Sequence, residues 1–316
     1  MGVLVDGVWR TGGFTTDERG AFRREATRFH HRITADGASG FAAEPGRYHL
    51  YVSLACPWAH RTLIGRKLKG LEDAISLSIV SPLMGEDGWT FEDGPGCLPD
   101  SVNGARFLRD TYRLADPHYT GRVTVPVLWD KVRKTIVNNE SAEILRMLNA
   151  EFDTIADASL DLYPEPLRAE IDAVNEVVFE TVNNGVYKAG FATRQAPYEE
   201  AVRALFATLD SLEVRLGERR YLCGERITEA DWRLFTTLVR FDAVYHGHFK
   251  CNLKRLVDYP NLWAYARALY QWPGVAGTVD FAHIKGHYYR SHLSINPSGI
   301  VPLGPLIDFT APHGRG

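Results

Sequence analysis

One cysteine, Cys56, lies where a strand-like pattern gives way to a helix-like one. Tyr48, Leu50 and Val52 alternate with other residues before it. Pro57 follows it, and proline suits a first helical turn because its missing N–H has no partner there. The free N–H groups and the positive dipole end of a helix N-terminus favour a thiolate. Such cysteines have pKa values as low as about 3.5–7.5, so Cys56 is predicted to be a nucleophile.

The Cys-Pro-Trp-Ala motif at 56–59 has one thiol where dithiol redox sites have two. Ala59 stands at the position of the second cysteine, so a second thiol has to come from another molecule. His246 and His248 have no further ligands nearby in the sequence, and no metal is expected. The other cysteines are isolated and are interpreted as structural: Cys97, Cys223 and Cys251.

The elements expected around Cys56 alternate between strands and helices in the order β-α-β-α-β-β-α. This order predicts an α/β sheet of the thioredoxin-like kind. A glycine-rich and proline-rich insertion at 82–103 interrupts it. The expected elements are a strand at 47–53, a helix at 57–69, a strand at 74–80, a helix at about 104–115, a strand at 123–129, a short strand ending at Val137 and a helix at 140–151.

After about residue 160 the strand signals stop and apolar residues follow helical spacing. One helix is expected to begin at Thr228, with Asp231 completing a capping box. The chain is therefore predicted to have an α/β half followed by an all-helical half. The predicted parts are an N-terminal extension draped over the core (1–42), a thioredoxin-like domain (43–155), an all-α domain (156–284) and an irregular tail closing over the substrate site (285–316).

Composition limits the function classes that this chain can serve. Its 316 residues are 45% hydrophobic and 24% charged, and the formal net charge is -3. A charge so close to zero indicates no nucleic-acid partner. No window approaches the roughly 18 apolar residues of a membrane span, and the N-terminus lacks a secretory pattern. Four scattered cysteines favour a reducing compartment, so a cytoplasmic protein is expected.

Two further places along the α/β half could bind a small peptide-like thiol. Pro126 interrupts a strand pattern, and in thioredoxin-like folds a cis-proline at this point exposes the backbone of the preceding residue, here Val125. Glu140 and Ser141 begin a helix, where N–H groups and a hydroxyl suit a carboxylate and Glu140 suits an ammonium group. The same residues could serve only as a helix cap, and both readings can hold together.

Several segments together resemble the glutathionyl-hydroquinone reductases, which are the Xi class of glutathione transferases. The first of these segments alone is shared with omega-type transferases, and the combination is more specific. The segments are CPWAHR at 56–61, DGW at 87–89, VTVPVLWD at 123–130, NNES at 138–141, NNGVYKAGF at 183–191, HIKGHYY at 283–289, SH at 291–292 and INP at 295–297.

This resemblance implies glutathione as the second thiol and names residues that would bind it. Trp89 would pack against glutathione, and Arg122 would pair with one of its carboxylates. Val125 would bind the cysteinyl part through its N–H and C=O. Glu140 would hold the α-ammonium group and Ser141 the carboxylate of the γ-glutamyl part. The resemblance also implies a homodimer.

For the aromatic substrate, the resemblance points to Tyr187, Tyr288 and Tyr289. A phenol can hydrogen-bond a quinol oxygen while its ring packs on the aromatic ring. Tyr187 or Tyr288 would also supply a proton. His60 and His287 are interpreted as structural.

The reaction that the resemblance implies is the reduction of glutathionyl-hydroquinones, as in quinone detoxification. Cys56 would attack the glutathione sulfur, and a second glutathione would resolve the mixed disulfide. One alternative is an omega-like thiol transferase or dehydroascorbate reductase, which would use the same cysteine. The other is a non-catalytic binding protein of the same fold.

Overall fold

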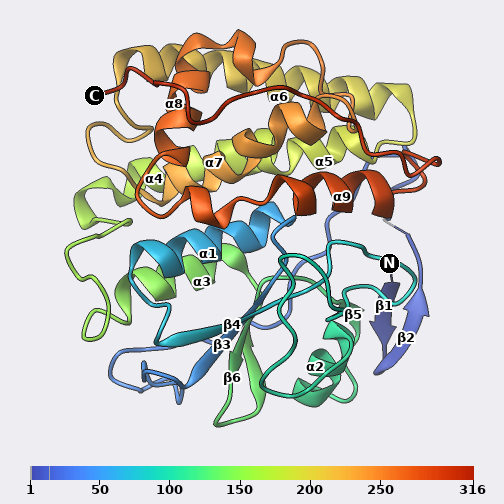
Figure 1. Ribbon diagram of the computed structural model, residues 1–316, viewed down its shortest axis with the longest axis vertical. Coiled ribbons are helices and arrows are strands. Elements are labelled where there is room, and N and C mark those ends of the chain that lie inside the picture. The colour runs from blue at the N-terminus through green and yellow to red at the C-terminus, as the bar shows by residue number, and fades with distance from the viewer. Residues whose placement is uncertain (1, 14) are drawn as a thin grey trace. The chain divides into compact units, whose positions relative to one another are not determined.

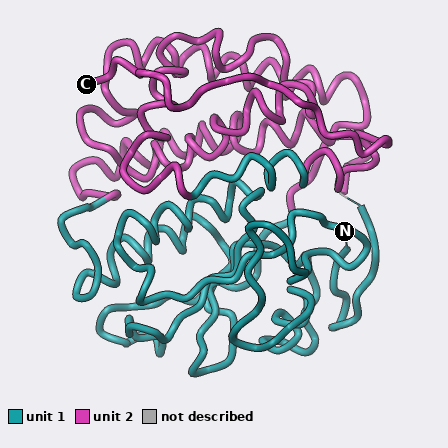
Figure 2. Tube along the Cα trace, viewed as in Figure 1, with its two compact units in different colours: residues 1–13, 25–161, 278–287 teal, residues 14–24, 162–277, 288–316 magenta. Residues whose placement is uncertain are grey.

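The computed structural model describes residues 2–13 and 15–316, and the chain divides into two compact units (Figure 2). The first unit comprises residues 1–13, 25–161 and 278–287, and the second comprises 14–24, 162–277 and 288–316. The expected N-terminal extension therefore contributes to both units. None of the described helices is long and apolar enough to cross a membrane.

A four-stranded sheet forms the centre of the first unit, in the order β4-β3-β6-β7 (Figure 1). Strand β3 (Tyr48–Val52) pairs in parallel with β4 (Ile75–Ile79) and antiparallel with β6 (Val127–Asp130), which pairs antiparallel with β7 (Thr135–Asn138). Helices α1 (Pro57–Leu68) and α3 (Ser141–Ala150) pack against each other, and α2 (Leu108–Ala115) packs beside β7. For this sheet and its helices the predicted order of elements is confirmed, and one additional two-residue strand, β5 (Gly121–Arg122), lies between α2 and β6 and belongs to a second sheet.

Two of these elements are shorter than the sequence pattern predicts. The strand expected at 123–129 begins only at Val127, because Pro126 has no N–H to donate to a ladder. The helix expected from about 104 begins at Leu108, after an extended Phe107. The backbone before β6 therefore stays outside the sheet, and Val125 lies just beyond the N-terminal end of that interior strand.

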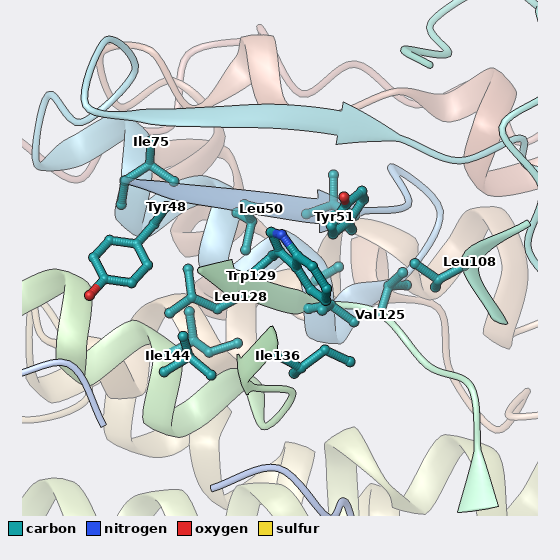
Figure 3. Close-up of a cluster of buried hydrophobic side chains, with 14 of the residues drawn as sticks. Tyr48, Leu50, Tyr51, Ile75, Leu108, Val125, Leu128, Trp129, Ile136 and Ile144 are labelled. Atoms are coloured by element: carbon teal, nitrogen blue, oxygen red, sulfur yellow. The ribbon is translucent and has the colours of Figure 1, made fainter. Parts of the chain in front are cut away.

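The core of the first unit lies around the central strand β3 (Figure 3). Leu50 faces Leu128 of β6 across the sheet, and the Trp129 side chain is fully buried. The alternating pattern suggested one buried face, but all five residues of β3 are buried. His49 is accommodated because its ring nitrogens hydrogen-bond Ser76 and Ser78, at 2.7 and 2.9 Å.

Burial of His49 gives the fold a pH dependence. Desolvation lowers the pKa of His49 from its ordinary 6.5 to about 4. Between these values the unfolded chain binds a proton that the folded chain does not, so the free energy of unfolding falls as pH drops from 6.5 towards 4, by at most about 3 kcal/mol. We expect His49→Gln to flatten this part of the curve of unfolding free energy against pH, measured by urea denaturation. An unchanged slope in the variant would contradict the assignment.

The N-terminus forms a hairpin that the sequence analysis missed. Strand β1 (Gly2–Val5) pairs with β2 (Val8–Thr11) and, on its other side, with β5 (Gly121–Arg122). Asp6 and Gly7 both have positive φ at the turn, of 50° and 70°. Asp-Gly between apolar residues is a strong hairpin signal, so the sequence did contain it. The hairpin fixes the short strand that carries Arg122.

The second unit is helical, as predicted. Two π-helical turns, η2 and η3, interrupt its helices, and the capping box of Thr228 and Asp231 is confirmed. Its elements are α4 (Arg168–Val178), η2 (Phe179–Asn183), α5 (Gly185–Gly190), α6 (Gln195–Glu218), α7 (Glu229–Arg240), η3 (Phe241–Tyr245) and α8 (Pro260–Tyr270), with 3-10 turns η1 (Glu165–Leu167) and η4 (Leu256–Asp258).

The sequence predicted an irregular tail from residue 285, but the structure has a helix over the first part of this segment. Helix α9 (Phe281–Ser291) continues through its first seven residues, after a 3-10 turn, η5 (Ala276–Thr278). The expectation was wrong because the prolines that stop a helix begin only at Pro297. Beyond Ser291 the chain has neither helix nor strand.

Candidate functional site

Cys56 is the N-cap residue of α1, and Pro57 occupies the first helical position. The thiol is half-buried and its sulfur lies 3.6 Å from the carbonyl oxygen of Val125. The Val125–Pro126 peptide bond is cis. The helix N-terminus and the backbone before Pro126 are thus next to each other, so a sulfur bound to Cys56 would lie beside the polar backbone of Val125.

The other three cysteines lie in surroundings that keep a thiol protonated. Burial raises the pKa of Cys223 to about 11 and that of Cys251 well above the ordinary range. Desolvation, together with Asp280 and Asp93, also raises the pKa of Cys97. All three are therefore thiols at neutral pH, which leaves them poor nucleophiles.

The N-terminus of α3 is linked to the cysteine helix through Arg61. The Arg61 guanidinium, which is buried, donates to the Ser141 hydroxyl at 3.4 Å and lies over the Trp58 ring at 4.5 Å. Glu140 is the N-cap of α3 and accepts from the Ala142 N–H at 3.2 Å, so the capping reading of Glu140 is confirmed. Sequence reasoning assigned no role to Arg61, although it stands one and a half turns after the nucleophile.

Arg122 already has a carboxylate partner in this structure. Its Nε donates to Glu25 at 3.2 Å, and its Nη2 donates to the Gly13 carbonyl at 2.6 Å. Two residues after Glu25, the Thr27 hydroxyl donates to the second carboxylate oxygen of Glu140 at 3.5 Å. Residues 25–27 of the N-terminal segment therefore contact both groups that were expected to hold the charged ends of glutathione.

Trp89 is buried, although its glycine-flanked loop gave no pattern that placed it in a core. Its ring stacks on His287 of α9, with centroids 4.9 Å apart. His287 also hydrogen-bonds the Pro82 carbonyl at 2.8 Å, and His283 bonds the Pro95 carbonyl at 2.6 Å. His60 bonds the Thr278 hydroxyl at 2.7 Å. The two histidines of α9 thus contact the 82–103 insertion at its first residue and again within it, at Pro95.

In the second unit, three buried tyrosines form a chain of phenols. The Tyr187 and Tyr288 oxygens are 2.5 Å apart, and the Tyr245 and Tyr288 oxygens are 3.0 Å apart. Tyr289 lies outside this chain and donates to the Ala243 carbonyl at 3.4 Å. Sequence reasoning missed Tyr245 because nothing local distinguishes it among 14 tyrosines. Tyr245 ends η3, while Tyr187 follows η2, and π-turns of this kind often occur at functional sites.

Two members of the phenol chain stay protonated at neutral pH. Desolvation raises the pKa values of Tyr245 and Tyr288 well above the ordinary value. Both groups are therefore neutral O–H donors at neutral pH. An aromatic oxygen placed against such a chain can accept a hydrogen bond without meeting a negative charge.

In the part of the chain that the structure describes, no three histidine, cysteine or carboxylate side chains gather into a group that could hold an ion. The arrangement of Cys56, Val125 and the start of α3 instead suits a thiol-containing peptide.

Comparison with known proteins gives matches to both halves of the chain. Residues 55–151 match the family model for the N-terminal domain of glutathione S-transferase, and residues 195–268 match the model for its C-terminal domain. The chain is 57% identical to the glutathionyl-hydroquinone reductase YqjG of Escherichia coli K12, covering 100% of this chain and 98% of that one. It is 56% identical to the glutathionyl-hydroquinone reductase PcpF of Sphingobium chlorophenolicum, covering 96% of each.

Solved structures give the same result. The glutathione-bound structure of YqjG matches with a TM-score of 0.93 at 56% identity, covering 99% of each chain. A Xi class transferase from Natrialba magadii matches with a TM-score of 0.94 at 53% identity, covering 100% of this chain and 96% of that one.

Proposed function

Because this chain belongs to the glutathionyl-hydroquinone reductases, the Xi class of glutathione transferases, we propose that it reduces glutathionyl-hydroquinones to free hydroquinones with glutathione. The observation that carries the proposal is the 57% identity to a reductase of that name over the whole chain. The geometry around Cys56 and the phenol chain supplies a chemical route.

The first half-reaction takes place at the sulfur of the conjugate. The Cys56 thiolate attacks this sulfur, an S–S bond forms, and the bond between sulfur and the aromatic carbon breaks. The electron pair of that bond goes to the ring carbon, which takes up a proton. Tyr187 or Tyr288, whose hydroxyls are hydrogen-bonded to each other, supplies this proton or polarises the quinol hydroxyl. Hydroquinone leaves, and Cys56 is joined to glutathione as a mixed disulfide.

The second half-reaction is ordinary thiol–disulfide exchange. A second glutathione thiolate attacks the glutathione sulfur of the mixed disulfide, which releases oxidised glutathione and restores the Cys56 thiolate. The sum converts one conjugate and one glutathione into hydroquinone and oxidised glutathione. No metal or further reductant is needed.

Glutathione binding is assigned to five residues of the first unit. Val125 binds the cysteinyl backbone beside Cys56, a role supported by the 3.6 Å distance between its carbonyl and the sulfur. Glu140 and Ser141 hold the γ-glutamyl end, where Arg61 adds a buried positive charge. Arg122 binds a glutathione carboxylate, which replaces Glu25 as its partner. Trp89 packs against the glutathione molecule.

The role of Trp89 yields a prediction at His287. We expect His287→Leu to raise the KM for glutathione about fivefold with a smaller change in kcat, because the ring stack and the bond to Pro82 both hold the Trp89 loop. Steady-state kinetics at varied glutathione measures this. His118→Ala is the matched control, since the His118 side chain is 82% exposed. An unchanged KM in the His287 variant would remove the assigned role.

The aromatic part of the conjugate is assigned to Tyr187, Tyr288 and Tyr289. The tail from residue 285 onwards closes over this part of the substrate. It begins with the C-terminal part of α9, which carries Tyr288 and Tyr289. Tyr289 contributes its ring, because its hydroxyl is engaged with a backbone carbonyl.

We further propose that the protein is a cytoplasmic homodimer. Its four cysteines are free thiols in the described structure, which suits a reducing compartment. The homodimer is proposed from the resemblance to the family. Light scattering coupled to size-exclusion chromatography should give twice the 35.5 kDa mass of one chain.

Product analysis tests the proposed activity. Purified protein with a glutathionyl-hydroquinone and excess glutathione should yield free hydroquinone and oxidised glutathione by chromatography, and the Cys56→Ala variant should yield neither. If only disulfides or dehydroascorbate are reduced, the omega-like alternative replaces this proposal. If the protein turns over none of these acceptors, the alternative of a non-catalytic binding protein with this fold replaces the proposal.

A further inference from the structure

A short piece of the N-terminal segment is fixed against α5, the helix that carries Tyr187. The Thr193 N–H donates to the Gly20 carbonyl at 3.0 Å. The Phe22 ring is buried and lies 5.5 Å from the Phe191 ring, at the C-terminal end of α5. These two anchors hold the residues that follow in a defined place, so the backbone at Arg24, which is itself an exposed residue, is fixed near α5.

The Arg24 guanidinium lies against the Tyr187 ring. Its central carbon is 4.9 Å from the ring centroid, within the range of a cation–π contact. Its Nε donates to the Asn184 side-chain oxygen at 2.7 Å, and Asn184 is a buried residue directly before α5. One side chain thus contacts both the start of α5 and the aromatic ring that α5 carries.

We propose that Arg24 is a positioning residue for Tyr187, which it orients and polarises for hydrogen bonding to the aromatic substrate. This inference rests on the proposed role of Tyr187 as a substrate and proton-donor residue. A cation over a phenol ring stabilises negative charge that develops on the phenol oxygen as its O–H donates. The bond to Asn184 holds the guanidinium in place, since an arginine fork loses little freedom once one of its donors is engaged.

The hydrogen bonds of Tyr187 explain why the charge of Arg24 would affect proton donation. Its oxygen is 2.5 Å from that of Tyr288, whose own oxygen is 3.0 Å from that of Tyr245. A chain of neutral phenols has no built-in direction, because each member can donate or accept. The positive charge of Arg24 over the Tyr187 ring makes Tyr187 the stronger donor and therefore directs a proton of the chain towards the substrate.

The neighbouring arginine offers a matched control. Arg23 is adjacent in sequence, carries the same charge and is exposed like Arg24, but its guanidinium pairs with Asp17 at 3.3 Å. A loss of function that came only from net charge or from a looser N-terminal segment would appear in both arginine variants.

The test compares Arg24→Met, Arg24→Lys and Arg23→Met in two assays. One assay is the reduction of a glutathionyl-hydroquinone. The other is glutathione-dependent reduction of a small aliphatic disulfide, which uses Cys56 but no phenol. We expect Arg24→Met to lower kcat of the first about fivefold, with unchanged KM for glutathione and unchanged disulfide reduction. Arg24→Lys, which keeps the cation, should recover most of this loss, and Arg23→Met should behave as the parent chain.

Three results would overturn the inference. They are an unchanged kcat in Arg24→Met, an equal loss in both assays, or Arg24→Lys no better than Arg24→Met. Tyr187→Phe separates this failure from that of the proposed function. If Tyr187→Phe keeps full conjugate reduction, the assigned role of Tyr187 itself is wrong. If Tyr187→Phe is impaired while Arg24→Met is not, only the role of Arg24 is removed.

Discussion

Replacing Cys56 by serine is expected to lower kcat/KM for glutathionyl-hydroquinone reduction by about 10³-fold or more. Serine keeps the size of the side chain and its place as N-cap of α1. Its hydroxyl, however, does not ionise near neutral pH and cannot form a disulfide with glutathione. Both half-reactions should therefore fail together, and mass spectrometry should find no glutathionylated protein after incubation with the conjugate.

Cys97→Ser is the matched control for this experiment. Cys97 is also half-buried, but desolvation and nearby carboxylates raise the pKa of its thiol. The variant should keep the activity of the parent chain and should still form a mixed disulfide at Cys56. Substantial turnover by Cys56→Ser, or glutathione found on another cysteine, would contradict the assignment of the nucleophile.

The sequence predicted the neighbourhood of this cysteine well because its signals are local. A strand pattern, a proline at the first helical position and a proline inside an apolar run are each readable within a few residues. They predicted the start of the cysteine helix and an interrupted strand at Pro126, and the structure adds that the Cys56 sulfur lies 3.6 Å from the Val125 carbonyl oxygen. The order of elements in the α/β half followed from the same kind of local signal.

Features that depend on distant residues could not be predicted in this way. Arg61 is buried against the start of α3, 80 positions away in the chain, and no local pattern reports that contact. Tyr245 joins the phenol chain through Tyr288, and the π-turn that ends at Tyr245 has no sequence signature. Trp89 stacks on His287, which lies far along the sequence.

Two other misses had signals that were available but outweighed. Asp6-Gly7 marks the N-terminal hairpin, but the polar, glycine-spotted composition of the first 42 residues suggested an extension without strands. In the tail, four prolines suggested irregular structure, although all of them follow α9. Both errors came from letting the composition of a long segment override a shorter local pattern.

Replacing Tyr288 by phenylalanine is expected to lower kcat for conjugate reduction about 10²-fold. The Tyr288 oxygen is the shared member of the phenol chain, bonded to Tyr187 at 2.5 Å and to Tyr245 at 3.0 Å. Its loss removes one hydrogen-bond partner from each of these two phenols and removes the proposed proton source for the leaving ring carbon. Resolution of the mixed disulfide by glutathione needs no such proton, so that step should proceed at the rate of the parent chain.

Single-turnover measurement separates the two steps. The variant is mixed with conjugate in the absence of free glutathione, and release of hydroquinone is followed by rapid quenching. Tyr198→Phe is the control, since the Tyr198 hydroxyl bonds only the Lys250 carbonyl among the contacts described, at 2.7 Å. A Tyr288→Phe protein with unchanged hydroquinone release would show that the proton comes from elsewhere.

The hydrogen bond between Tyr187 and Tyr288 also predicts how the losses of activity in the two phenylalanine variants combine. If Tyr187 and Tyr288 act as one donor unit, the Tyr187→Phe and Tyr288→Phe losses should not multiply, because either change already breaks the 2.5 Å bond between them. The double variant should then be about as slow as the slower single variant. Losses that multiply would mean that each phenol contacts the substrate independently, with one polarising the quinol hydroxyl and the other protonating the ring carbon.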